Sequence, residues 1–340
     1  MKKISEKENF MLFMRGEHPH WVPRFGFGPP DSFSKYPPAV AGIGPSFLRE
    51  GRTPEGGHDI FGVEYAVSEE TSGASIPVPN QFMLDDITKW RDIIRVPDIS
   101  HIDWEQLAKK DLANVNRDTT AVMATIHVGF FQQLMAFMGF SNGLCAMYEE
   151  PEEVCALFQY MADFYAEVSE KTVEYYKPDL FDLTDDTATA INPFFSTEMY
   201  RELVKPYHHM QTKPAVERGL PVTVHNCGRC EDLIEDWFDL GVTAWNPAQV
   251  MNDLDGIKKK YGRRLGLIGC WDSAGPVNWP TATEEFIRGQ VRATIDRFAP
   301  GGGFCFWGST YGPIGDEFTE NRKRWLTEEY ESYGRSFYEK

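Results

Sequence analysis

Short apolar runs alternate with stretches of helical periodicity along this 340-residue chain. Several of the runs are hydrophobic at almost every position, which is typical of parallel strands whose two faces are both covered. Such an alternation predicts an α/β fold in which helices cover a parallel sheet. The eight strand candidates are Val22–Gly26, Ile60–Val67, Ala121–His127, Asp179–Asp185, Pro221–Cys227, Val242–Asn246, Leu265–Cys270 and Gly303–Gly308.

The segments between these runs carry helix signals. Apolar residues recur with a period of 3.6 after Pro151, and proline is favoured in a first helical turn. Thr283 is a predicted N-cap, and Ser196 is predicted to cap a helix over Glu198–Val204 that stops at Pro206. Pro and Gly cluster between residues 23 and 57, where we predict long loops.

Eight strands with intervening helices predict a (β/α)8 TIM barrel with an N-terminal helical and loop elaboration, built as a single domain over residues 1–340. An open, doubly wound sheet is the alternative. No G-x-G-x-x-G motif occurs at a strand-to-helix turn, which argues against a dinucleotide-binding fold.

The charge balance excludes some classes of partner. The chain has 51 acidic and 34 basic residues and a formal net charge of −17, which argues against nucleic acid, whose phosphates need basic patches. No secretory signal follows the first residues, and no apolar run approaches the 18 residues of a membrane span. We therefore expect a cytoplasmic protein with reduced thiols, in which the six cysteines favour metal binding over disulfides.

Three potential metal ligands follow one strand candidate within six residues: His225, Cys227 and Cys230. The H-x-C and C-x-x-C spacings let neighbouring side chains converge on one cation, and thiolate with imidazole favours zinc. Cys270 ends another strand candidate, and strand ends meet at one edge of a barrel. We predict a zinc site held by these four residues, with thiol packing as the alternative. A catalytic site requires one of the four to be absent or displaced, since four protein ligands close a zinc site.

Two carboxylates and a histidine also fall at predicted strand ends. Asp185 and Asp186 are adjacent, and carboxylates at a barrel mouth can donate a proton or orient a ligand. His127 ends an earlier apolar run. We predict these three residues to be catalytic; a helix cap for the carboxylates and a buried, hydrogen-bonded histidine are the alternatives.

Aromatic side chains near the same strand ends predict a pocket for a ring. Phe130 and Phe131 follow His127, and Trp271 follows Cys270. With the strand-end amide Asn246, we predict them to bind substrate, although aromatic residues most often pack in the core.

The chain resembles the uroporphyrinogen decarboxylase superfamily and, within it, the corrinoid-dependent methyltransferase branch. The superfamily is a (β/α)8 barrel, so the resemblance implies the same fold. True decarboxylases carry an Arg-rich stretch after the first strand, whereas Pro23–Pro30 contains one Arg, too little charge for an anionic tetrapyrrole. The matching stretches are Asp59–Val63, Asp185–Thr189, Ser196–Glu202 with Lys205–Tyr207, His225–Gly228, Asn252–Gly262 and Gly302–Phe304.

The branch holds zinc through an H-x-C motif and a distant cysteine. His225 and Cys227 match the first part of this ligand set. In thiol-methylating members the distant cysteine lies on the last strand, where Cys305 comes earlier than that ligand should. Members that demethylate aryl methyl ethers use a C-x39-C pair, which is the separation of Cys230 and Cys270.

The resemblance therefore implies that a methyl group passes from a small aryl methyl ether to the cob(I)alamin of a separate corrinoid protein, with zinc as the Lewis acid. Methylation of a thiol by methylcobalamin is the alternative. Porphyrinogen decarboxylation fits less well. A further alternative is a non-catalytic barrel in which zinc is structural and which serves only as an interaction platform. The sequence identifies neither the methoxylated ring of the substrate nor whether the chain forms a homodimer.

Overall fold

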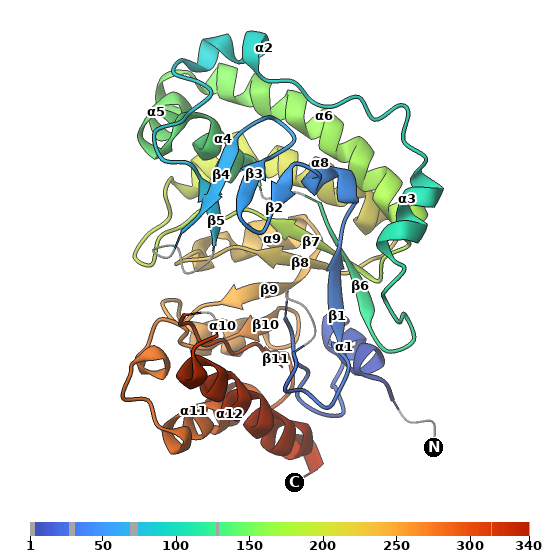
Figure 1. The fold of residues 1–340 in the computed structure, drawn as a ribbon, viewed down its shortest axis with the longest axis vertical. Helices are drawn as coiled ribbons and strands as arrows, with labels where there is room; N and C mark the ends of the chain where they lie inside the picture. The colour runs from blue at the N-terminus through green and yellow to red at the C-terminus, as the bar shows by residue number, and fades with distance from the viewer. Residues whose placement is uncertain (1–3, 27–30, 69–73, 127–128, 314, 340) are drawn as a thin grey trace.

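A parallel seven-stranded sheet forms the centre of the computed structural model, which describes residues 4–26, 31–68, 74–126, 129–313 and 315–339 (Figure 1). All neighbouring strands pair in parallel, so their carboxyl ends lie on the same side of the sheet. In spatial order the strands are β1 (Val40–Ile43), β6 (Ala121–Thr125), β7 (Leu180–Thr184), β8 (Val222–His225), β9 (Val242–Ala248), β10 (Gly266–Gly269) and β11 (Phe304–Phe306).

The sheet is curled around an inner core. Val40 of β1 and Cys305 of β11 belong to the same buried cluster, although their strands form the two edges of the sheet. Helix α1 (Glu6–Met14) contributes Phe10 and Phe13 to this cluster. Gly266 of β10 leaves room for the helix, because a Cβ at this position would lie 2.5 Å from Phe13 Cζ.

Helices cover the outer side of the sheet. Pro151 opens the longest, and Thr283 caps α11 through its side chain, so both predictions are confirmed. Helices α6 and α8 pack on each other beside β7, and α11 packs on α12 near the C-terminus (Figure 1). The remaining helices are α2 (Trp90–Ile93), α3 (Trp104–Asp111), α4 (Phe130–Met138), α5 (Phe140–Glu149), α6 (Pro151–Tyr176), α7 (Thr197–Met199), α8 (Lys205–Glu217), α9 (Ile234–Asp239), α10 (Leu254–Tyr261), α11 (Glu284–Phe298) and α12 (Glu317–Tyr333).

A second, four-stranded antiparallel sheet follows β1 in the chain. Its members are β2 (Arg52–Thr53), β3 (Gly56–His58), β4 (Glu64–Val67) and β5 (Ser75–Pro77). The prediction of a barrel strand over Ile60–Val67 is therefore wrong, since β4 pairs with β3 and β5 and has alternately exposed residues. The alternating exposure along β4 is typical of a strand with one solvated face.

The first parallel strand is β1, inside the segment for which long loops were predicted. The four residues Val40–Ile43 include a glycine and follow two prolines, so no local pattern in the sequence predicts this strand. The candidate Val22–Gly26 contributes one parallel bridge, between Arg24 and Phe306 at the β11 edge. Five of the other six candidates contain β6, β7, β8, β10 and β11, and Val242–Asn246 covers the first part of β9, which confirms all six.

The predicted helix stop at Pro206 is wrong. Ser196 caps α7 as expected, but a π-helical turn over Tyr200–Val204 leads directly into α8, whose first turn contains Pro206. Proline is compatible with a first turn because the nitrogen there has no intrahelical acceptor. No helix in the described segments is both long enough and apolar enough to cross a membrane.

Candidate metal centre and cavity

The carboxyl end of β8 places His225 and Cys227 between its two neighbouring strands. His225 is the last residue of β8 and lies in register with Thr184 of β7 and Asn246 of β9. Gly228 then turns the chain with a φ of +95°, and a Cβ there would lie 2.5 Å from the Ala188 carbonyl oxygen. The turn therefore needs a glycine and brings Cys227 back over the strand end.

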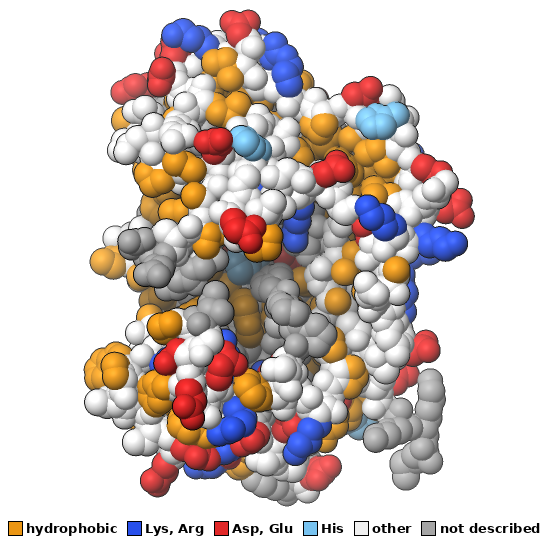
Figure 2. All heavy atoms as spheres, in the orientation of Figure 1, with side chains coloured by type: hydrophobic (Ala, Val, Ile, Leu, Met, Phe, Trp, Pro, Cys, Tyr) orange, Lys and Arg blue, Asp and Glu red, His pale blue; other side chains and the backbone are white. Residues whose placement is uncertain are grey.

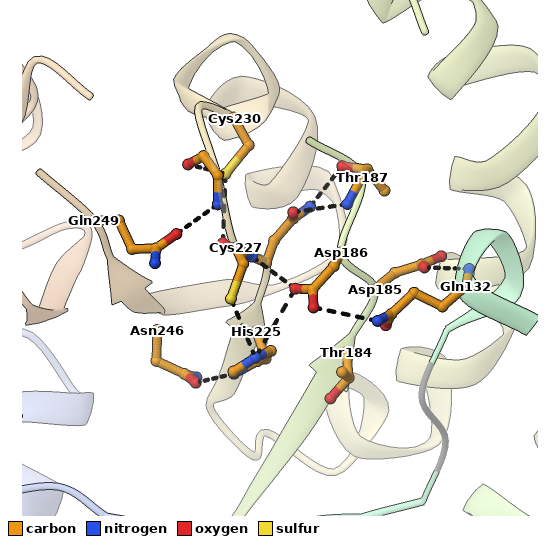
Figure 3. A network of polar contacts seen from close by, with 12 residues as sticks. Gln132, Thr184, Asp185, Asp186, Thr187, His225, Cys227, Cys230, Asn246 and Gln249 are labelled. Carbon is orange, nitrogen blue, oxygen red and sulfur yellow. Dashed lines mark hydrogen bonds and ion pairs between the residues drawn. The ribbon is translucent and has the colours of Figure 1, made fainter. Parts of the chain in front are cut away.

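Three side chains converge at this point (Figure 3). Asp186, His225 and Cys227 each offer one ligand atom, and these atoms lie within 4.8 Å of one another. Cys227 Sγ is 3.8 Å from His225 Nε2, which is in turn 3.9 Å from Asp186 Oδ1. Within the described residues, no other group of histidine, cysteine and carboxylate side chains meets this criterion.

A chain of polar contacts fixes the orientation of the His225 ring. Nδ1 lies 2.7 Å from Asn246 Oδ1, and Asn246 Nδ2 donates to Asp182 Oδ1. Asp182 also accepts from the hydroxyls of Thr223 and Thr184. Because a carbonyl oxygen only accepts, Nδ1 carries a proton, and Nε2 is the ring nitrogen that faces the group. Asn246 is therefore placed as the outer partners that orient metal-binding histidines are placed.

The donor set fits zinc. Imidazole nitrogen, thiolate sulfur and carboxylate oxygen are all zinc ligands, and three protein ligands leave one position open. The 3.8 Å between Sγ and Nε2 is close to the ~3.5 Å expected for two tetrahedral ligands with bonds of ~2.3 and ~2.0 Å. Burial raises the pKa of the Cys227 thiol, and the charge of Asp186 raises it further. The thiol therefore keeps its proton until a cation displaces it.

Cys230 and Cys270 do not join this group. The Cys230 thiol is buried and lies 3.5 Å from the Asn226 carbonyl oxygen, within its own turn. Cys270 lies beyond the end of β10 and lines a cavity with His225 and Cys227, but its thiol is not part of the group. The charges acting on that thiol belong to Lys258, Arg297 and Asp255 of the outer helices. Burial raises the pKa of both thiols, as expected for packed cysteines. Of the four predicted ligands, His225 and Cys227 therefore lie in the group, together with Asp186, whereas Cys230 and Cys270 stay predicted ligands that lie outside it.

Asp185 faces away from the metal group, although it neighbours Asp186. Its carboxylate is 1% exposed and accepts from the backbone nitrogens of Phe131 and Gln132, in the first turn of α4. It also lies 3.1 Å from His208 Nε2, and His208 Nδ1 contacts the Tyr200 hydroxyl. Asp185 therefore caps α4 from a distant strand. Its predicted catalytic role stays a prediction. Asp186 instead accepts from the Gln132 amide and the Cys227 backbone nitrogen.

A cavity of about 470 Å³ extends from His225 toward the antiparallel sheet. Figure 2 shows this face hollowed near its middle, with a histidine side chain visible in the hollow. Apolar side chains such as Ile60 and Ile126 share its wall with polar and aromatic ones. The polar and aromatic lining residues are Arg49, Arg52, Thr53, Asp59, Tyr65, Thr125, Gln133, Tyr165, Asp182, Thr184 and His225.

The predicted ring-binding residues are distributed differently. Phe130 and Phe131 are fully buried in the core, where Phe131 contacts other phenylalanine rings, so neither lines the cavity. Trp271 lines a second, smaller cavity of about 170 Å³, which also includes His225 and Cys227. His225 thus belongs to both cavities. The predicted catalytic residue His127 lies outside the described residues.

Sequence reasoning missed several residues around the site. Asp182 had a usable signal, because it is a charged residue inside the apolar strand β7, two positions before Thr184 on the same face. Burial raises the pKa of its carboxyl, against the effect of its hydrogen-bond donors. Arg49 and Arg52 had no such signal, since they lie in a loop-rich segment without periodicity.

Replacing Asn246 with alanine is expected to lower zinc affinity by about 10- to 100-fold, because His225 loses the partner that fixes its ring. Competition with a chromogenic chelator measures this change. Asn278→Ala is a matched control on an outer loop. Unchanged affinity in the Asn246 variant would show that other contacts suffice to orient His225.

Cys230→Ala and Cys270→Ala are expected to retain the zinc content of the unmodified protein, measured by atomic emission after gel filtration. Both thiols are packed outside the metal group, so their loss removes apolar contacts and no ligand. A fall in zinc content in either folded variant would restore that cysteine to the ligand set.

Comparisons with known proteins agree with this architecture. The sequence profile of the family described as "Uroporphyrinogen decarboxylase (URO-D)" matches residues 80–307. The fold is similar to that of a solved structure described as a methyltransferase from Methanosarcina mazei, with a TM-score of 0.61 and 13% sequence identity. That alignment covers 97% of this chain and 100% of the other. No curated protein matches the sequence.

Proposed function

Since this chain belongs to the uroporphyrinogen decarboxylase family, by a match over residues 80–307, we propose that it is a zinc-dependent methyltransferase of that family. It takes a methyl group from an aryl methyl ether and passes it to the cob(I)alamin of a separate corrinoid protein. The products are a phenol and methylcobalamin, with one proton taken up by the phenolate. We further propose that residues 1–340 form one (β/α)8 barrel domain, with the bridge at Arg24 in place of an eighth strand.

The observation that carries this proposal is the group of Asp186, His225 and Cys227, in which His225 lines both cavities and Cys227 the smaller one. Bound there, zinc supplies Lewis acidity toward the ether oxygen or a neighbouring phenol oxygen. An aryl ether oxygen leaves poorly without such help. His225 and Cys227 hold the cation, and Asn246 keeps the His225 lone pair directed at it.

The larger cavity suits a small aromatic substrate. Its volume of about 470 Å³ lies within the ~300–1,000 Å³ typical of small-molecule sites. Tyr65 and Tyr165 provide aromatic surface, and Ile60 and Ile126 provide apolar surface that excludes water from the ring. Asp186 reaches the group from the β7 side, where it serves as third ligand or as hydrogen-bond partner of the departing oxygen.

The smaller cavity provides an approach for the methyl acceptor. It includes His225 and Cys227, and its rim carries Tyr311, which is 56% exposed. Tyr311 donates its backbone N–H to Asn278, so the exposed Trp279 lies on the adjoining loop. Exposed aromatic side chains of this kind are enriched in protein interfaces. The corrinoid partner is proposed to dock on this rim.

Methyl transfer is tested with zinc-loaded protein, a methoxylated benzene such as guaiacol or veratrole, and cob(I)alamin generated with a titanium(III) reductant. The expected result is methylcobalamin absorbance together with an equimolar amount of demethylated phenol. Cys145→Ala, at an exposed position on α5, is the matched control for thiol substitutions. Phenol release without metal, after exhaustive chelation, would contradict the proposal.

Thiol methylation is the second candidate, because the H-x-C pair is common to both reactions in the family resemblance. Cys305 does not support it, since this residue is fully buried in the inner core with Phe10 and Phe13. A cysteine in that place cannot supply the distant ligand of the thiol-methylating members. Methyl transfer from methylcobalamin to a thiol, with no reaction of any ether, would reverse this preference.

A further inference from the structure

Two arginines line the larger cavity without an acidic partner. Within the part of the chain that the structure describes, the Arg49 side chain has neither a hydrogen bond nor an ion pair, and Arg52 donates to the hydroxyl of Ser75. The Arg52 guanidinium stacks 3.5 Å from the centroid of the Tyr65 ring, so one of its faces is fixed. By contrast, arginines such as Arg24, Arg201 and Arg288 in this chain of 51 acidic residues form ion pairs with carboxylates.

The carboxylates of the cavity wall do not neutralise these arginines. Asp59 accepts from the backbone nitrogens of Phe61 and Val63 and from the Gln133 amide. Asp182 is engaged by two hydroxyls and by Asn246. Both therefore have neutral donors as partners, and neither forms an ion pair with Arg49 or Arg52.

The two guanidinium groups also act on each other. Burial lowers the pKa of Arg49, and the charge of Arg52 lowers it further. Two like charges in one cavity repel, and an anion between them relieves the repulsion while accepting hydrogen bonds from both. Arginine's planar fork matches a carboxylate in particular, through two parallel N–H···O bonds.

The arginines and the metal group approach the cavity from different elements. Arg49 and Arg52 belong to the segment that leads into the antiparallel sheet, whereas His225 and Thr184 come from the ends of parallel strands. A molecule in the cavity therefore contacts basic groups from the covering segment and the metal group from the parallel sheet. In Figure 2 basic side chains are visible beside the hollow.

We propose that Arg49 and Arg52 bind a carboxylate of the substrate, so that the cavity takes an aromatic acid with a methoxy group, such as a methoxybenzoate. The methoxy group in this inference rests on the proposed methyl transfer. The anion site is argued from Arg49 and Arg52 alone. The same pair could bind the oxyanion of a short sulfonate, which is the other source of this chemistry.

Binding is measured by calorimetry on zinc-loaded protein without any corrinoid. The probes are 4-methoxybenzoate, its neutral analogue 4-methoxybenzamide, and 2-sulfanylethanesulfonate. The benzoate is expected to bind at least about tenfold more tightly than the amide, because charge-assisted hydrogen bonds exceed neutral ones. Arg49→Gln and Arg52→Gln are each expected to weaken benzoate binding by about tenfold or more and to leave amide binding unchanged.

Controls separate this inference from folding and from the proposed reaction. Arg49→Gln removes no hydrogen bond or ion pair among the described residues, so it remains informative if Arg52→Gln loosens Tyr65. Arg15→Gln, an exposed change at the end of α1, should have no effect. His225→Ala abolishes methyl transfer under the proposed function but should leave Arg-dependent benzoate binding in place.

Equal binding of benzoate and amide, or benzoate binding that both arginine variants retain, would overturn the inference. Arg-dependent binding of the sulfonate alone would also overturn it, in favour of a thiol substrate. If neutral ethers are demethylated while carboxylates are rejected, the methyl transfer stands and the anion site fails. Arg-dependent benzoate binding without any methyl transfer supports the anion site and contradicts the proposed function.

Discussion

Cys227→Ala is expected to abolish stoichiometric zinc binding and to reduce methyl transfer by at least about 1,000-fold. The Cys227 sulfur lies 3.8 Å from His225 Nε2 and provides the only thiolate of the group. A bound cation contributes several kcal/mol of transition-state stabilisation, and each ~1.4 kcal/mol corresponds to a factor of ten in rate. Zinc content by atomic emission and phenol release by chromatography measure the two effects.

The informative comparison for Cys227→Ala is with Cys145→Ala, in which an exposed thiol is lost far from β8. That control should keep both zinc and activity. Melting temperature should change little in either variant, since Cys227 is only partly buried. Retention of zinc and full activity by Cys227→Ala would mean that the metal lies elsewhere, and the proposed site would be abandoned.

Asp185→Ala is expected to destabilise the folded protein by about 3–5 kcal/mol, the usual loss when one partner of a buried charged contact is removed. The substitution leaves the backbone nitrogens of Phe131 and Gln132 and the ring nitrogen of His208 without their acceptor. All of these contacts are buried or partly buried, so water cannot replace the carboxylate freely. Denaturant unfolding followed by circular dichroism measures the loss against a total of ~5–15 kcal/mol.

Asp186→Ala provides a matched neighbour for this experiment. Asp186 is partly exposed and accepts from Cys227 and Gln132, so its removal should cost only about 1–2 kcal/mol of stability. Its zinc affinity should fall, whereas folded Asp185→Ala should keep its zinc affinity. A loss of zinc affinity in Asp185→Ala but not in Asp186→Ala would mean that Asp185, not Asp186, belongs to the metal site.

The sequence predicted what depends on short stretches of chain. β8 with its H-x-C motif, the helix opened by Pro151 and the cap at Thr283 each involve residues within a few positions of one another. Hydrophobic periodicity and cap chemistry are local signals, so they survive without knowledge of the tertiary structure. The position of His225 at the end of a parallel strand was predictable for the same reason.

The roles that sequence could not assign depend on contacts between distant segments. Asp185 looks identical to Asp186 in the sequence, but strand geometry turns it toward a helix that begins 55 positions earlier. Cys230 and Cys270 have the spacing of a ligand pair, yet neither joins the group of Asp186, His225 and Cys227: the Cys230 thiol contacts its own turn, and Cys270 lies on the wall of the smaller cavity. Arg49 became a candidate binding residue only because it lines the cavity of the folded chain, which no local sequence pattern indicates.

The position of α1 has a consequence for biosynthesis. Phe10 and Phe13 leave the ribosome early, but their binding place includes Gly266 and Cys305, which are made near the end of translation. The aromatic face of this helix therefore cannot be buried until most of the polypeptide has been synthesised. Until then the nascent chain exposes Phe10 and Phe13 to solvent. Ribosome-bound intermediates of this protein should be good clients for chaperones that recognise aromatic segments.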